Sequence, residues 1–174
     1  MLKLYNTLTK QKEHFVPLNA SEVGLYVCGM TVYDHCHLGH ARVWVVFDVL
    51  VRYLKQLEYH VNYVRNITDV DDKIIKKAAT NQESIQTLTQ RMIRSMHEDM
   101  QSLGLLPASC EPQATENISQ MIQLIQTLMA KGYAYIGTSG DVYYAVNQFK
   151  PYGKLTQQAL KELMSGARVT VDAN

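Results

Sequence analysis

This sequence has few cysteines, almost no net charge and no long apolar run. The 174 residues include three cysteines, an odd number that argues against a disulfide framework. Residues 1–9 lack the basic flank and apolar centre of a signal peptide, and no apolar run is long enough to span a bilayer. These absences predict a cytoplasmic protein with no membrane partner.

Charge is nearly balanced, with 17 Lys and Arg residues against 16 Asp and Glu residues and a net charge of +1. No overall field therefore attracts a polyanion. Local basic spots occur at Lys73, Lys76 and Lys77 and at Arg91 and Arg94, and we interpret both as solvated helix faces. The hydrophobic fraction of 47% is enough for one sizeable core or two small ones.

The most informative window is residues 26–40, which read Tyr-Val-Cys-Gly-Met-Thr-Val-Tyr-Asp-His-Cys-His-Leu-Gly-His. The apolar run at residues 25–27 is typical of a short buried parallel strand. Beyond Ala41, apolar residues recur at helical spacing: Val43, Trp44, Val46, Phe47, Leu50, Val51 and Leu54. The tetrad at residues 37–40 is therefore predicted to open a helix after a strand.

The tetrad has the chemistry of a phosphate site. A helix N-terminus has unpaired N–H groups that attract anions, and Gly39 lets the backbone approach a flat ring such as adenine. His37 and His40 add ring N–H donors for phosphate oxygens or for charge that develops in phosphoryl chemistry. The spacing alone is weak evidence, because histidines at helix starts are often only capping or solvated, and that alternative stays open.

A second strand is predicted at residues 59–68, which are rich in β-branched and aromatic side chains. Strand, helix and strand form a βαβ unit with a right-handed crossover. A nucleotide would then lie at the carboxyl ends of the strands, where residues 29–31 and the tetrad converge. No Gly-x-Gly-x-x-Gly pattern occurs, so a dinucleotide cofactor is not indicated.

The rest of the sequence is mainly helical in pattern. Asp69, Asp71 and Asp72 predict the capped start of a helix that ends at Gly104, with capping preferred over metal binding. One face of this helix is apolar and predicts core packing: Ile85, Leu88, Met92, Met96, Met100 and Leu103. A further helix is predicted from an N-cap at Thr115 to Lys131, followed by a hairpin of residues 133–136 and 142–146.

These segments resemble the N-terminal part of bacterial cysteinyl-tRNA synthetase, a class I aminoacyl-tRNA synthetase. The resemblance rests on residues 4–9, on residues 26–40 with the His-Leu-Gly-His tetrad, and on residues 63–77. It runs from Met1 nearly to the last residue. Leu38 stands where the family signature usually has isoleucine, which is a volume-conserving change.

The resemblance implies an α/β fold in which residues 1–132 form the first half of a Rossmann-like, class I synthetase nucleotide-binding domain. Residues 133–174 would begin an α+β connective insertion, and the second half of the sheet would be missing, which leaves one edge strand exposed. Class I synthetases also use a Lys-Met-Ser-Lys-Ser signature, which is absent here. We therefore expect the 174 residues alone to be inactive.

The activity that the resemblance implies is activation of L-cysteine with ATP and Mg²⁺ to cysteinyl-adenylate, followed by transfer of cysteine to tRNA(Cys), by a parent protein that is a monomer. His37 and His40 would be catalytic. Other implied contacts are Met30, His37, Gly39 and His40 with ATP, and Gly29, Thr31 and Asp34 with the amino acid, with His35 as a weaker candidate.

The resemblance also implies a zinc ion that binds the substrate thiolate, with Cys28 as its first protein ligand and the other ligands beyond residue 174. Zinc prefers sulfur and holds a thiolate better than the hydroxyl of serine, so no editing site would be needed. Cys36 and Cys110 are interpreted as ordinary small apolar residues.

Two alternatives remain open at this point. One is an ATP-dependent cysteine ligase of thiol-cofactor biosynthesis, which shares the cysteine and the His-x-Gly-His region but charges an amino sugar. The other is a non-catalytic, truncated nucleotide-binding module.

Overall fold

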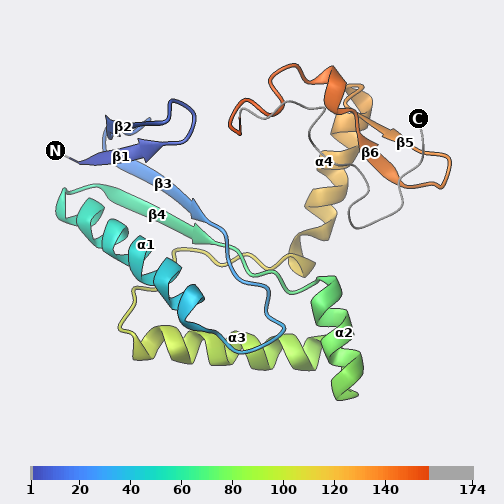
Figure 1. Ribbon diagram of the computed structural model, residues 1–174, viewed down its shortest axis with the longest axis horizontal. Coiled ribbons are helices and arrows are strands. Elements are labelled where there is room, and N and C mark those ends of the chain that lie inside the picture. The colour runs from blue at the N-terminus through green and yellow to red at the C-terminus, as the bar shows by residue number, and fades with distance from the viewer. Residues whose placement is uncertain (1, 157–174) are drawn as a thin grey trace. The chain divides into compact units, whose positions relative to one another are not determined.

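The computed structural model describes residues 2–156 of the chain, which fall into two compact units. Residues 17–118 form one unit, which contains the parallel strands and three of the helices (Figure 1). The other unit comprises residues 2–16 and residues 119–156 of the described part of the chain. None of the helices in residues 2–156 is both long and apolar enough to cross a membrane.

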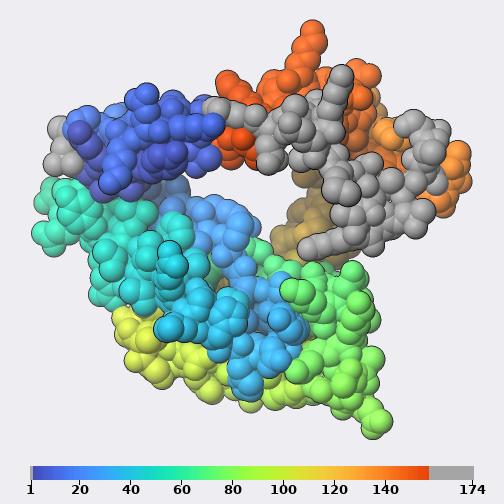
Figure 2. All heavy atoms as spheres, in the orientation of Figure 1, coloured from blue at the N-terminus to red at the C-terminus, as the bar shows by residue number. Residues whose placement is uncertain are grey.

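The predicted strand–helix–strand unit is confirmed. Strand β3 (Glu22–Val27) pairs in parallel with β4 (His60–Arg65), and α1 (Leu38–Gln56) connects them. Figure 1 shows α1 running alongside the two strands. The connection from β3 to α1, residues 28–37, lies at the surface between the atoms of α1 and those of α2 (Asp72–Asn81), as Figure 2 shows.

A third extended segment lies along β4 and was not predicted. The N–H of Arg65 donates to the carbonyl of Cys110 at 3.1 Å, and the N–H of Ile67 donates to the carbonyl of Pro112 at 2.9 Å. Residues 109–114 thus run parallel to β4, although Pro112 in this stretch has no backbone N–H to donate to a regular ladder. Among the strands of residues 2–156, β3 has only β4 as its partner in a sheet, so its other edge is open.

The prediction of one continuous helix ending at Gly104 is wrong, because this part of the chain forms two helices. The first is α2, and α3 (Ile85–Ser102) follows after a break. Gln82 adopts a left-handed conformation with φ of 55°, which ends α2, and the Ser84 side chain then accepts from the N–H of Thr87. Asp71 caps α2 as predicted, since its carboxylate accepts from the N–H of Lys73 at 2.9 Å.

Asp69 and Thr115 were both predicted as helix caps, and both predictions are wrong. The Asp69 carboxylate is buried and accepts from the N–H of Thr115 at 3.0 Å and from the Thr115 hydroxyl. Thr115 lies inside the 3₁₀ helix that follows, whose N-cap is Ala114 and which has no side-chain cap hydrogen bond. A short 3₁₀ helix, Thr115–Asn117, leads instead into α4 (Ile118–Ala130), close to the predicted helix.

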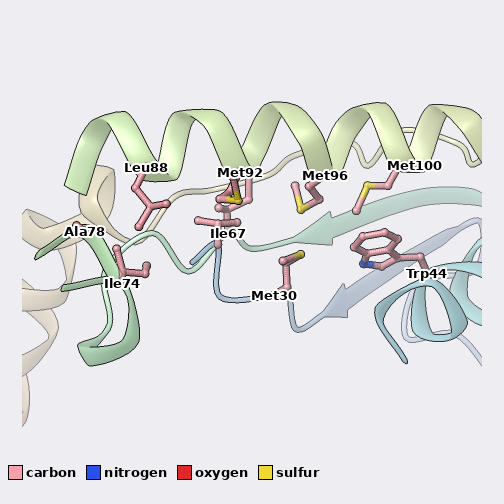
Figure 3. Close-up of a cluster of buried hydrophobic side chains, with 10 residues drawn as sticks. Met30, Trp44, Ile67, Ile74, Ala78, Leu88, Met92, Met96 and Met100 are labelled. Carbon is pink, nitrogen blue, oxygen red and sulfur yellow. The ribbon is translucent and has the colours of Figure 1, made fainter. Parts of the chain in front are cut away.

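The core of the larger unit lies beneath α3. Figure 3 shows the side chains of Leu88, Met92, Met96 and Met100 spaced along α3 and directed toward Met30, Ile67 and Trp44. The remaining buried members of this cluster are Val32, Ile74 and Ala78. The predicted apolar stripe is therefore confirmed as core packing. Met30 and Val32 follow β3 and Ile67 follows β4, so the core anchors the segments at the ends of both strands.

The other unit contains two antiparallel hairpins. The predicted hairpin is confirmed as β5 (Ala134–Ile136) and β6 (Val142–Tyr144), and it leads into a 3₁₀ helix, Val146–Gln148. The hairpin of β1 (Lys3–Asn6) and β2 (Gln11–His14) was not predicted. Part of the predicted insertion, residues 157–174, lies outside the described residues, and the boundary at residue 132 stays a prediction.

Truncating the centre of the core tests this packing. Met96 is 2% exposed, and we expect Met96→Ala to lower the free energy of unfolding by about 2–5 kcal/mol because it leaves a cavity that the neighbours fill only in part. Gln101→Ala, on the exposed side of the same helix, is the control and should stay within about 0.5 kcal/mol. Urea unfolding measures both, and equal effects of the two substitutions would contradict the packing described.

Candidate active site

The candidate site begins where the backbone after β3 touches the backbone after β4. The N–H of Gly29 donates to the Asn66 side-chain oxygen at 2.7 Å. A Cβ atom on Gly29 would lie 1.5 Å from the Asn66 carbonyl oxygen, so no larger residue fits there without moving the backbone. The Asn66 amide nitrogen also donates to the Thr68 hydroxyl at 3.3 Å.

Two further backbone bonds continue this contact. The N–H of Val32 donates to the Thr68 carbonyl at 3.1 Å, and the N–H of Thr68 donates to the Met30 carbonyl at 3.2 Å. Gly29 and Thr31, both predicted site residues, are thereby brought beside Asn66 and Thr68. Sequence analysis missed these two polar residues, although their position just after a parallel strand was a usable signal.

The tetrad forms a reciprocal cap at the start of α1. The His37 ring accepts at Nδ1 from the N–H of Gly39 at 3.1 Å, and the N–H of His37 donates to Nδ1 of His40 at 3.2 Å. The two rings are stacked, with their centroids 3.9 Å apart. The capping interpretation is therefore correct, and it leaves Nε2 of each ring available for another role.

The cap determines which ring nitrogen carries the proton. A nitrogen that accepts a hydrogen bond has no proton, so a neutral ring that accepts at Nδ1 is protonated at Nε2. Both His37 and His40 accept at Nδ1 and thus present an Nε2–H donor. Burial, and to a smaller extent the neighbouring His37, lower the pKa of His40 below its ordinary value of 6.5, which keeps that ring neutral at pH 7.

Asp34 and His35 turn toward the supporting helices. An Asp34 carboxylate oxygen lies 2.8 Å from Nζ of Lys77 on α2, and this hydrogen bond is the main cause that lowers the pKa of Asp34. Nδ1 of His35 lies 3.1 Å from the Ser95 hydroxyl on α3. The predicted contact of Asp34 and His35 with the amino acid stays a prediction.

Met30 and Cys36 belong partly to the core. Met30 is 7% exposed, so the predicted contact with ATP would have to come from its backbone. The Cys36 sulfur lies 3.4 Å from the Met30 sulfur, and burial, helped by the Asp99 carboxylate, raises the pKa of the Cys36 thiol to about 12. Cys36 therefore behaves as the small apolar residue that was predicted, whereas Cys110 is exposed and does not.

Cys28 is an exposed free thiol directly after β3, next to Gly29. Zinc in proteins needs three or four ligands, and no group of three His, Cys, Asp or Glu side chains within residues 2–156 could hold an ion. The Cys28 thiol is a suitable zinc ligand, and it would supply one of the three or four ligands that the ion needs. The predicted zinc site stays a prediction.

Comparisons with known proteins agree with this geometry. The family model described as "tRNA synthetases class I (C) catalytic domain" matches residues 14–174. The cysteine--tRNA ligase of Hahella chejuensis (strain KCTC 2396) is 59% identical over 173 residues, which are 99% of this chain and 37% of that protein. The cysteine--tRNA ligase of Thioalkalivibrio sulfidiphilus (strain HL-EbGR7) is 58% identical over 172 residues, with the same two shares. This chain thus spans 37% of the length of either relative.

Among solved structures, a LeuRS of Agrobacterium radiobacter K84 (agnB2), in a ternary complex with tRNA and LeuAMS, has a similar fold. The TM-score is 0.55 at 26% identity, over 64% of this chain and 15% of that chain. The predicted α/β class I synthetase fold is confirmed by this match and by the family model. The chain belongs to the family of class I (C) tRNA synthetase catalytic domains.

Proposed function

We propose that this chain supplies one side of an active site that activates L-cysteine with ATP and then passes cysteine to tRNA(Cys). The observation that carries the proposal is the reciprocal cap of the tetrad, which presents two neutral Nε2–H donors at a helix N-terminus. The names of the two relatives described above, both cysteine--tRNA ligases, support cysteine as the amino acid and tRNA rather than an amino sugar as the acceptor.

The reaction needs donors at the phosphates. A carboxylate oxygen of cysteine attacks the α-phosphorus of ATP and forms a P–O bond, while the bond from that phosphorus to the oxygen bridging to the β-phosphate breaks and pyrophosphate leaves. Negative charge spreads over the phosphate oxygens during this step. The N-terminus of α1 and the Nε2–H groups of His37 and His40 would stabilise that charge without moving a proton.

The other residues of the site would bind the substrates. Gly29 and Thr31, held beside Asn66 and Thr68, would line the amino-acid pocket, and Gly39 would allow the adenine ring to approach the backbone. Cys28 would be one ligand of a zinc ion that, when bound, coordinates the substrate thiolate. In this proposal ATP comes with Mg²⁺, and the protein acts in the cytoplasm as a monomer.

The domain assignment belongs to the same proposal. Residues 1–132 would form the first half of the nucleotide-binding domain, and residues 133–174 would begin the connective insertion. The open edge of β3 within the described residues supports a sheet to which further strands add.

Two substitutions of His40 test the role of its Nε2–H donor separately from the role of Nδ1 in the helix cap. We expect His40→Asn to slow cysteine-dependent ATP–pyrophosphate exchange by about 100-fold, because its amide oxygen can replace Nδ1 in the cap while no group replaces Nε2–H. His40→Gln, whose amide nitrogen can reach the position of Nε2, should retain more activity. The KM for cysteine should change little in either variant.

This assay uses the protein expressed from its complete open reading frame, with serine in place of cysteine as the substrate control. His14→Ala, on the exposed strand β2, is the matched control for loss of a histidine and should exchange at the unsubstituted rate. Exchange at the unsubstituted rate by His40→Asn would refute the assigned role, and the absence of cysteine-dependent exchange in the unsubstituted protein would refute the proposed function.

The lowered pKa of His40 predicts a pH dependence of stability. Its folded pKa lies below the ordinary 6.5, so the unfolded chain binds the proton more tightly and stability falls as pH decreases below about 6.5. The loss should be complete once the pH is below the folded pKa. Urea midpoints measured from pH 7.5 to pH 5 should decrease more in the unsubstituted protein than in His40→Asn. Parallel decreases in both proteins would contradict the prediction.

A further inference from the structure

The connection from β3 to α1 carries the residues that directly precede the capped histidines, and it has no regular secondary structure of its own. Its position must therefore come from contacts with other elements. In the middle of the connection, one oxygen of Asp34 lies 2.8 Å from Nζ of Lys77, while the other accepts from the N–H of His35 at 2.9 Å. The carboxylate thus joins the loop backbone to α2.

Helix α2 is a firm support for this contact. Ile74 and Ala78, on its inner face, are 0% and 3% exposed in the core. Lys73 lies one turn before Lys77, on the same side of the helix, and its Nζ is 5.5 Å from the centre of the Tyr33 ring. Two lysines of α2 therefore contact consecutive residues of the loop, Tyr33 and Asp34.

The contact continues toward the tetrad. His35 reaches Ser95 on α3, and Cys36 packs against Met30 in the core. Every residue from Tyr33 to Cys36 is thereby held by a separate contact, and the next residue is the N-cap, His37. Figure 2 shows the same arrangement at the surface, where the loop lies against the green atoms of α2.

The exposure of the ion pair between Lys77 and Asp34 favours a role in positioning the loop over a role in global stability. The Lys77 and Asp34 side chains are 38% and 49% exposed, and ion pairs that are this accessible to water contribute little to global stability. The rate of catalysis is more sensitive to such a contact than stability is, because a displacement of about 1 Å at a reacting group can slow catalysis by about 100-fold. One oxygen of Asp34 bonds to the loop backbone and the other to Lys77, so its carboxylate is suited to holding the loop against α2.

We propose that Lys77 and Asp34 form a positioning pair that sets the place of His37 and His40 relative to the phosphates of ATP. This inference rests on the proposed function of the two histidines. Lys77 acts through Asp34 and the loop and touches no substrate. Its removal lowers the rate of adenylate formation and leaves the binding of cysteine intact.

The test is cysteine-dependent ATP–pyrophosphate exchange by the protein from its complete open reading frame. Lys77→Met keeps the length of the side chain and removes its charge, and kcat should decrease by about 10-fold or more with the KM for cysteine unchanged. Lys77→Arg should restore part of kcat. Lys76→Met removes a charge from the neighbouring exposed position of the same helix and should leave kcat within about 2-fold of the unsubstituted value.

A double substitution tests whether the two residues act as a pair. Asp34→Asn should lower kcat as much as Lys77→Met, and the double variant should be no slower than either, because each substitution breaks the same contact. Additive losses would overturn the inference. So would an unchanged kcat in Lys77→Met, or equal losses in Lys76→Met and Lys77→Met.

Hydrogen–deuterium exchange provides a readout that does not depend on activity. Lys77→Met should speed the exchange of the amides of residues 33–37 and leave those of α3 unchanged, whereas Lys76→Met should alter neither. If the unsubstituted protein shows no cysteine-dependent ATP–pyrophosphate exchange, the proposed function fails. The hydrogen–deuterium exchange data still decide whether the pair of Lys77 and Asp34 holds the loop. If the amides of residues 33–37 stay equally protected in Lys77→Met, this result alone would overturn the inference that Lys77 and Asp34 hold the loop.

Discussion

The candidate site depends on how closely the backbone after β3 approaches the backbone after β4. Gly29 lies against the Asn66 carbonyl so tightly that a Cβ atom would overlap it, and the Asn66 side chain holds the N–H of Gly29. The backbone bonds between Val32, Thr68 and Met30 extend the contact beyond the ends of the strands. Because parallel strands end at the same edge of a sheet, this contact gathers the cysteine, the threonines and the start of α1 on one edge.

Apolar packing and polar contacts have different tasks in this arrangement. Burying a methionine side chain contributes about 1.5–3 kcal/mol, and α3 buries three of them over the segments that follow the strands. An exposed ion pair such as that of Lys77 and Asp34 contributes about 0–1 kcal/mol. The core therefore determines that the loop is folded, while the polar contacts determine where its side chains point. The histidine cap adds a chemical consequence, because a neutral ring that accepts at Nδ1 carries its proton on Nε2.

Local sequence patterns predicted the elements well and the long-range contacts poorly. Strands β3 and β4, the helix that opens at the tetrad and the methionine stripe follow from patterns among neighbouring residues, whereas the β1–β2 hairpin was not predicted. The break between α2 and α3 was missed because Gln82 takes a left-handed conformation that is usual for glycine. Asp69 was assigned to a cap because its partner Thr115 is 46 positions away, and no local pattern reveals such a pairing. The contact of Lys77 with Asp34 was missed for the same reason, whereas Asn66 could have been noticed from its place just after a parallel strand.

The most direct test of this account is the protonation of the two histidine rings at the start of α1. Long-range nitrogen NMR correlations distinguish a ring protonated at Nδ1 from one protonated at Nε2. At pH 7.5 the account predicts that both His37 and His40 are neutral and carry the proton on Nε2, because each accepts a backbone hydrogen bond at Nδ1. A proton on Nδ1 of either ring would show that the reciprocal cap does not form, and would contradict the arrangement on which the proposed chemistry depends.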